Sequence, residues 1–368
     1  MTDIVKHLHP SAFAMVMGTG IVSIAFNGLG YEGIAQGLFA VNLVAYLLLL
    51  LTFGLRVLFF RNAFLADFRH PERGWGFLTF VVGTNTLGSQ LFLFQDSLLV
   101  IEGGIDPILT AKGLWGLGLV SWAVFLYLIC ARLVTHNHGP IENTVNGATL
   151  LVVVSTQSVA VLGSQLAGAF GTFSDVMMLV ALTHFAAGWV LYLIVITLVT
   201  YRLLLRPLEP KDWTGPYWIC MGAAAITTLA GANMLLHLDV GDLYEAILVV
   251  TYLAWATGVW WIPIQLYLDV WKFTRLNLSG RRPLWISLFP WLRLAFGRGP
   301  HYHYESPSWG RVFPMGMFTA CTIALTQVGN FKILFVIPSV WSWLALLIWG
   351  LTFLGMLRSV GQAITSQP

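Results

Sequence analysis

Residues 75–95 read Trp-Gly-Phe-Leu-Thr-Phe-Val-Val-Gly-Thr-Asn-Thr-Leu-Gly-Ser-Gln-Leu-Phe-Leu-Phe-Gln, a run without a charged residue that is long enough to cross a bilayer. A transmembrane helix needs about 20 mostly apolar residues, because every backbone N–H and C=O must be paired within the segment. The centre of this run is polar, with threonines on both sides of Asn85. Such a segment indicates a membrane helix whose polar side is shielded from lipid by other helices.

The rest of the chain has the same character. Hydrophobic residues make up 57% of the 368 positions and charged residues 10%, whereas soluble domains carry about one quarter charge. The sequence therefore predicts one transmembrane domain over residues 1–368 with ten membrane-spanning helices. The predicted spans lie at 11–28, 34–60, 75–95, 112–133, 144–170, 174–204, 217–237, 242–274, 311–333 and 335–358.

The placement of lysine and arginine predicts the orientation of these spans, because these residues are retained on the cytoplasmic side. If the N-terminus is cytoplasmic, 17 of the 19 lysines and arginines fall in cytoplasmic ends and loops, and Lys112 and Lys332 fall outside. An even number of spans then places both termini in the cytoplasm. We expect a multi-pass protein of the plasma membrane, with a cytoplasmic loop at about 275–310.

Small and hydroxylated residues alternate along the chain. Gly, Ser and Thr fill 31 of 110 positions in the odd-numbered spans and 21 of 137 in the even ones, and Leu-Gly-Ser-Gln occurs at both 87–90 and 162–165. Small residues allow close helix packing, whereas lipid-facing surfaces are richer in large apolar side chains. We therefore predict five helical hairpins, with five inner odd helices around a central pore and five outer even helices.

The polar residues of the odd spans are the candidates for lining that pore. Hydrogen bonds between helices are the alternative explanation for each of them, because an unpaired amide in hydrocarbon costs several kcal/mol. The candidates are Gly18, Thr19, Gly20, Thr84, Asn85, Gln157, Ser158, Thr228, Asn233, Thr319 and Thr322.

The predicted pore contains no fixed charge well inside an odd span, so tight binding of an ion is not expected. Hydroxyl, amide and backbone dipoles could stabilise a passing anion, and basic residues at the cytoplasmic mouth would raise its local concentration. His184 in the sixth span is a possible titratable group, although packing within the helix bundle is the favoured explanation. Neither of the short histidine-containing runs, at 135–138 and 301–304, has a third ligand at suitable spacing, so we expect no metal or cofactor.

Two motifs resemble a known family. The segments Met17-Gly18-Thr19-Gly20-Ile21 and Trp309-Gly310-Arg311-Val312-Phe313-Pro314-Met315-Gly316, together with ten spans, resemble the tellurite-resistance and dicarboxylate transporter family. That family includes bacterial TehA proteins, plant guard-cell slow anion channels, and fungal malate permeases and sulfite pumps. The motif forms are closer to the malate and sulfite branch. The resemblance implies a pore of five inner helices, closed by the Phe313 side chain above a kink at Pro314, and a homotrimer.

The resemblance implies transport of a small anion, such as malate, sulfite, tellurite, nitrate or chloride. A proton-coupled carrier of four-carbon dicarboxylates is the alternative within transport, and a membrane receptor or scaffold without flux is a more remote one. An enzyme is not expected, because the spans hold no zinc-protease motif, no nucleophile elbow and no pair of aspartates. Nucleic-acid binding is not expected either, since the net charge is only +3 and no basic tract occurs.

Overall fold

The computed structural model describes residues 5–97, 100, 103–104, 106–136, 139–278, 304–329 and 331–365. The secondary structure of these residues is helical. One long helix overlaps each predicted span, and these ten helices fall into two groups. The core helices are α2 (Ala14–Gly28), α5 (Leu78–Leu93), α8 (Leu151–Leu166), α10 (Ile219–His237) and α14 (Trp309–Val328). The peripheral helices are α3 (Glu32–Phe59), α7 (Pro107–His136), α9 (Ser174–Leu205), α11 (Tyr244–Leu278) and α15 (Val336–Thr365).

Burial separates the two groups. The most apolar windows of Pro10–Gly28 and Gly215–His237, which contain α2 and α10, are 83% and 89% buried. The corresponding window of Pro107–His136, which forms α7, is only 17% buried. Leu, Val and Ile side chains dominate the exposed surface of the peripheral helices, which is the surface that a bilayer would cover.

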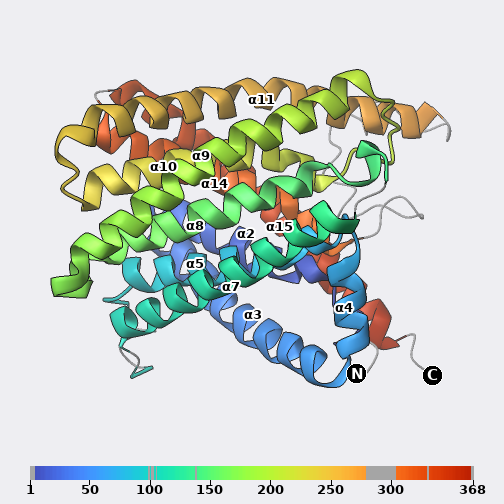
Figure 1. Ribbon diagram of the computed structural model, residues 1–368, viewed down its shortest axis with the longest axis horizontal. Coiled ribbons are helices and arrows are strands. Elements are labelled where there is room, and N and C mark those ends of the chain that lie inside the picture. Colours follow the sequence, from blue (N-terminus) through green and yellow to red (C-terminus); the bar gives the residue numbers. More distant parts are fainter. Residues whose placement is uncertain are drawn as a thin grey trace.

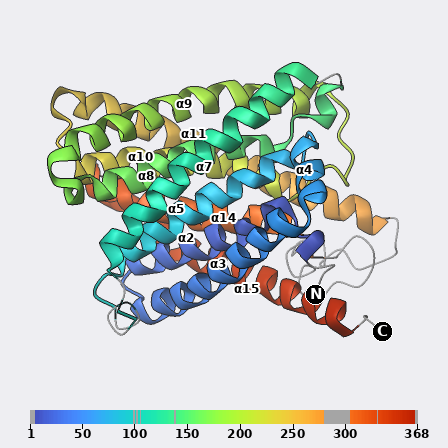
Figure 2. The ribbon, with the colours of Figure 1, turned by 60° about the horizontal axis from the view of Figure 1, so that its bottom comes forward.

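The core helices contact one another in a closed cycle. Helix α2 packs on α5, α5 on α8, α8 on α10, α10 on α14, and α14 again on α2. Each peripheral helix packs on the core helix that precedes it and on the core helix that follows it in the chain, and α15 packs on α14 and α2. Figure 1 shows the long helices side by side in one bundle, and Figures 1 and 2 both place the two chain termini at the same end.

Seven stretches of the described chain are long and apolar enough to cross a membrane. One of them, Gly147–Leu205, contains both α8 and α9, whereas α5 and α14 lie outside all seven. Both helices carry buried polar residues, such as Asn85 and Gln90 in α5 and Arg311 in α14, and these residues lower the mean hydropathy. A test of length and apolarity therefore finds all five peripheral helices but misses two of the five core helices.

A short 3-10 turn precedes each core helix. These turns are η1 (Pro10–Phe13), η2 (Gly74–Phe77), η4 (Gly147–Leu150), η6 (Gly215–Trp218) and η8 (Ser306–Ser308). They also contact one another in a closed cycle, from η1 through η2, η4, η6 and η8 back to η1, and we call this ring the collar. The approach is close: a Cβ on Gly147 would overlap the carbonyl group of Pro216. The collar places the N-termini of all five core helices at one end of the molecule.

An additional helix, α4 (Arg61–Arg69), lies at the collar end and was not expected from the sequence. Its Asp67 accepts a hydrogen bond from Arg56 at 2.5 Å and forms an ion pair with Arg73 at 2.8 Å. These contacts tie the end of α3 to the segment that leads into α5. Most of the predicted cytoplasmic loop at about 275–310 lies outside the described residues.

Candidate functional site

Aromatic side chains on the peripheral helices bind hydroxyl groups of the core helices. Trp122 of α7 donates to Thr156 of α8 at 2.9 Å, and Trp255 of α11 donates to Thr322 of α14 at 3.0 Å. Trp349 of α15 donates to Thr19 of α2 at 2.9 Å, and the Tyr46 hydroxyl of α3 is 3.1 Å from the Thr84 hydroxyl of α5. These threonines therefore face the outside of the core ring and bind the peripheral helices to it.

The amides of the core helices are also used between helices. Gln157 donates to the Phe185 carbonyl of α9 at 3.1 Å, and Asn85 donates to the Ser158 hydroxyl of α8 at 2.9 Å. The Asn85 side chain also lies directly against Gly118 of α7, where a Cβ would overlap it. Since these amides contact neighbouring helices, they join helix to helix instead of lining a wide passage.

The remaining predicted pore residues occupy three kinds of position. Gly18 faces α14, and Gly20 faces Thr86 of α5, so both glycines permit close helix contacts. The hydroxyls of Thr228 and Thr319 donate to carbonyls of their own helices, at 3.0 Å in each case. The side-chain nitrogen of Asn233 is buried and has no hydrogen-bond partner among the described residues.

Phe313 lies on α14 between the faces that pack on the two neighbouring core helices. Val312 packs against Gly18 of α2, and Pro314 packs against Gly222 of α10. Because an α-helix turns about 100° per residue, Phe313 lies midway between these two contacts. Its side chain is completely buried.

The opposite side of α14 faces the peripheral helices. The Thr322 hydroxyl accepts the bond from Trp255, and the Phe318 ring packs against Trp255 and Trp341 at centroid distances of 6.3 and 5.6 Å. On the helical wheel, Thr322 and Phe318 lie about 140° to 180° from Phe313. Phe313 thus occupies the face of α14 turned away from the peripheral layer.

Assigning each face of α2 to the helix that it contacts identifies residues that the sequence analysis did not select. Thr19 faces α15, while Gly18 and Gly20 face the two neighbouring core helices. The remaining side carries Met17 and Ile21, which are buried and apolar, and Ile21 also packs against Gly316 of α14. Apolar residues are common in every membrane helix, so the sequence alone does not single out Met17 and Ile21. They stand out only after the other faces of α2 have been assigned to neighbouring helices.

A buried charged cluster lies at the collar end of α14. Arg311 donates to Asp269 of α11 at 3.0 Å, and the same carboxylate accepts hydrogen bonds from Trp213 at 2.7 Å and Trp218 at 3.0 Å. A buried ion pair is stabilised only when further hydrogen bonds satisfy its remaining atoms, and the two indoles do this for Asp269. The cluster fixes α11 to α14 and to η6. The sequence analysis did not select Asp269, which read as one acidic residue near the end of a long span.

His184 lies away from the core ring. Its Nδ1 is 2.8 Å from the Val180 carbonyl of the same helix, and its ring packs on Trp122 of α7 at a centroid distance of 4.6 Å. The histidine is thus placed between the peripheral helices α9 and α7. Nothing in this position connects it to the interior faces of α2 or α14.

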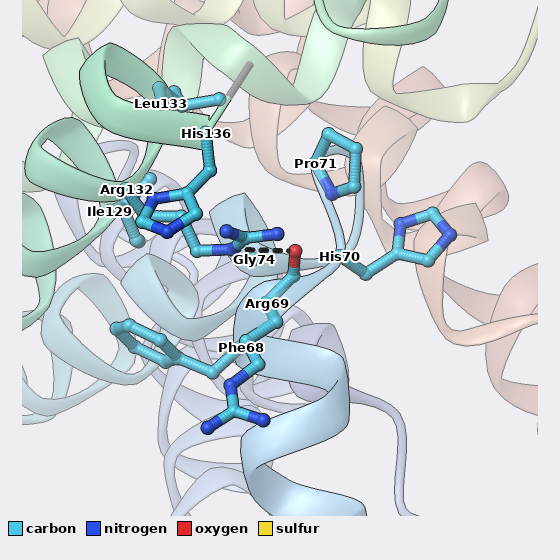
Figure 3. Close-up of a pocket in the computed structure, with 9 residues that line it drawn as sticks. All are labelled: Phe68, Arg69, His70, Pro71, Gly74, Ile129, Arg132, Leu133 and His136. Atoms are coloured by element: carbon cyan, nitrogen blue, oxygen red, sulfur yellow. Dashed lines mark hydrogen bonds between the residues drawn. The ribbon is translucent and has the colours of Figure 1, made fainter. Parts of the chain in front are cut away.

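A surface pocket opens at the collar end between α4 and the end of α7, as Figure 3 shows. Arg132 donates to the carbonyl of Arg69 at 2.8 Å across this pocket. His70 and His136 lie on opposite sides of it. Among the described residues, no group of three His, Cys, Asp or Glu side chains is arranged to hold a metal ion.

A closed ring of buried helices inside a layer of exposed apolar helices defines a polytopic membrane protein. The chain belongs to the SLAC1 voltage-dependent anion channel family, whose sequence pattern it matches over residues 7–357. This match confirms the resemblance to the tellurite-resistance and dicarboxylate transporters. The family consists of transporters and channels.

Relatives extend along the whole chain. An uncharacterised transporter of Methanocaldococcus jannaschii is 24% identical over 96% of this chain and 93% of its own length. A sulfite efflux pump of Arthroderma otae is 23% identical over 95% of this chain and 90% of its own length. An uncharacterised membrane protein of Mycobacterium tuberculosis is 34% identical, over 47% of this chain and 79% of the relative.

Proposed function

We propose that the chain conducts small anions along the axis of the core ring, and that Phe313 is the side chain that closes this path. The position of Phe313 carries the proposal: it is buried on the face of α14 opposite the peripheral helices, one turn beyond the collar. An aromatic ring in a narrow apolar passage blocks ions by excluding water. Pro314, which lacks a backbone N–H, allows α14 to bend next to this side chain.

The collar supports an anion as the permeating species. The N-terminus of a helix carries a partial positive charge of about half a unit, and five such ends meet in the collar. The core helices contain no Asp or Glu, and their one lysine or arginine is Arg311, at the collar end. The five helix ends would attract an anion to the mouth, and the uncharged interior would not retain it.

We propose further that the ten long helices cross the membrane as five hairpins, with the collar in the cytoplasm. The closed cycle of core helices and the alternation of buried and exposed helices support the hairpins. The excess of lysine and arginine at the collar end supports the orientation. A homotrimer in the plasma membrane is the assembly that the family resemblance implies, and cross-linking in native membranes would test it.

Sulfite is the first anion to test, because sulfite efflux pumps are among the full-length relatives. Purified protein in liposomes should release sulfite slowly, and Phe313→Ala should raise the rate at least about tenfold, which corresponds to about 1.4 kcal/mol of barrier. Malate, chloride and nitrate belong in the same assay to rank the substrates.

Phe318→Ala is the matched control, since Phe318 is a buried phenylalanine of the same helix that packs on Trp255 and Trp341. It should leave the flux unchanged. Equal flux in the two variants, or no increase with Phe313→Ala, would refute the gate. Accumulation of malate driven by a pH gradient alone would instead favour a proton-coupled carrier.

A further inference from the structure

Helix α9 has a buried stripe that ends in an arginine. Tyr192, Val195, Val199 and Arg202 are spaced three or four residues apart, so they share one face of the helix, and all four are buried. Arg202, at the end of this stripe, lies next to the collar and carries a positive charge. Arg202 is only 6% exposed.

Among the described residues, the guanidinium of Arg202 has no partner of opposite charge. Its Nε and Nη1 are buried, and no acceptor in the described part of the chain binds them. In the described part of the chain, no carboxylate forms an ion pair with it, and Glu142, on the same end of the molecule, pairs with the exposed Arg206. What Arg202 does contact is the ring of Tyr217, which lies 5.7 Å from its Cζ.

Tyr217 adds a second unsatisfied donor. It belongs to η6 of the collar, its side chain is fully buried, and no described residue forms a hydrogen bond with its hydroxyl. The ring is held by stacking on Trp213, at a centroid distance of 4.7 Å. The tyrosine is therefore fixed in place, with its hydroxyl free to donate.

An uncompensated buried charge is among the least favourable features of a folded protein. A buried charge left without its partner is strongly destabilising, and a cation–π contact with one tyrosine ring does not supply the negative charge and hydrogen-bond acceptors that a guanidinium needs. The guanidinium and the phenol hydroxyl both supply protons for hydrogen bonds. The missing partner must accept hydrogen bonds and carry negative charge.

We propose that Arg202 and Tyr217 bind a small oxyanion at the collar, and that the permeating anion occupies this site before it enters the path. This inference rests on the proposed function for the identity of the anion, but not for the existence of the site. A planar guanidinium donates two parallel N–H groups to two oxygens of one anion. The site therefore takes a carboxylate or a sulfite in preference to a single-atom halide.

Thermal unfolding of the purified full chain in detergent tests the site, with sulfite and malate titrated against a constant background of sodium chloride. A ligand that binds only the folded state raises the unfolding temperature in a saturable manner. We expect this response in the wild type and its loss in Arg202→Gln. Tyr217→Phe retains the charge and should raise the half-saturating concentration about tenfold, the effect of a hydrogen bond worth about 1.4 kcal/mol.

Arg206→Gln is the control, because Arg206 lies on the same helix end but is exposed and already paired with Glu142. It should respond to sulfite as the wild type does. In chloride alone, Arg202→Gln should unfold no earlier than the wild type, since it removes an uncompensated charge; earlier unfolding would indicate that the arginine only supports packing.

The same sulfite and malate response in Arg202→Gln and the wild type would overturn the proposal, as would the absence of a saturable response in the wild type. These outcomes are independent of transport. Saturable binding that depends on Arg202 without any flux would retain the site and refute the conducting path. Flux without binding would refute the site alone.

Discussion

His9 shows how a single residue at the collar responds to its surroundings. Its Nδ1 accepts a hydrogen bond from the backbone N–H of Ser11 at 3.1 Å, at the start of η1. Burial, and then the positive charge of Arg73, lower the pKa of His9 from 6.5 to about 4; Arg56 acts in the same direction and Asp67 opposes it. The histidine is therefore neutral in the folded protein at physiological pH.

This lowered pKa predicts that acid destabilises the collar. The unfolded chain takes up a proton near pH 6.5, whereas folded His9 does so only near pH 4. The free energy of unfolding is therefore highest above pH 6.5, where His9 is neutral in both states. It falls as the pH decreases toward 4, by about 2 kcal/mol between pH 7 and pH 5. Unfolding temperatures in detergent from pH 7.5 to 5 measure it. His9→Asn retains an acceptor for Ser11 and should flatten the profile; an unchanged slope would contradict this explanation.

At the scale of residues, the sequence predicted which side chains are polar but not where they point. Thr19, Gln157 and Thr322 are buried in core helices, yet each has its hydrogen bond with a peripheral helix. The helical wheel relates residues of one helix only, and the direction of a face depends on which helices surround it. Met17 and Ile21 became visible as interior residues only after those neighbours were known.

At the scale of elements, the aromatic-to-hydroxyl bonds recur at four of the five core helices, α2, α5, α8 and α14. Trp122, Trp255 and Trp349 each donate to a threonine of the next core helix around the ring. Side-chain hydrogen bonds within membranes contribute about 0.6 kcal/mol each on average. Each bond therefore adds little to the stability of the protein. Together, the repeated bonds fix how the peripheral helices are aligned along the core helices.

A double-mutant cycle measures one of these bonds. Trp349→Phe and Thr19→Val should each destabilise the protein, and the double variant should lose less than the sum by about 0.6 kcal/mol, because both changes break the same bond. Unfolding in mixed micelles provides the free energies. Trp343→Phe combined with Thr19→Val is the comparison and should be additive, since Trp343 of the same helix packs on Phe26 instead. Additivity in both cycles would rule out the bond.

The long helices could be predicted from apolar segments, and the collar could not. Each span contained one helix, and the resemblance to an anion-transporting family was confirmed. The 3-10 turns were counted as loop or as the first turn of a span. Their signal was a Gly or Pro within the first two residues, as in Gly215-Pro216 and Ser306-Pro307, but such residues also mark ordinary turns. The contacts that join these turns into the collar are between segments far apart in the sequence, so they could not be predicted from local sequence.

At the scale of the whole molecule, the proposed topology makes a prediction about accessibility. Asp239 follows the C-terminal end of α10, whereas Glu209 lies in the loop that precedes α10, and both side chains are exposed. A membrane-impermeant maleimide should label Asp239→Cys in intact cells, but Glu209→Cys only after the membrane is opened. The unsubstituted chain controls for its three native cysteines, two of which are buried. The reverse pattern would invert the orientation, and labelling of both in intact cells would contradict the hairpins.

The bond from Trp349 to Thr19 joins residues 330 positions apart, and it closes the ring between the last helix and the first. During synthesis, α2 must enter the membrane long before α15 exists to cover it. Until then, the hydroxyl of Thr19 and one flank of α2 remain open to lipid or to the insertion machinery. A nascent chain that stops short of α15 would present an unsealed wall, which is the kind of surface that membrane quality-control proteases recognise and degrade.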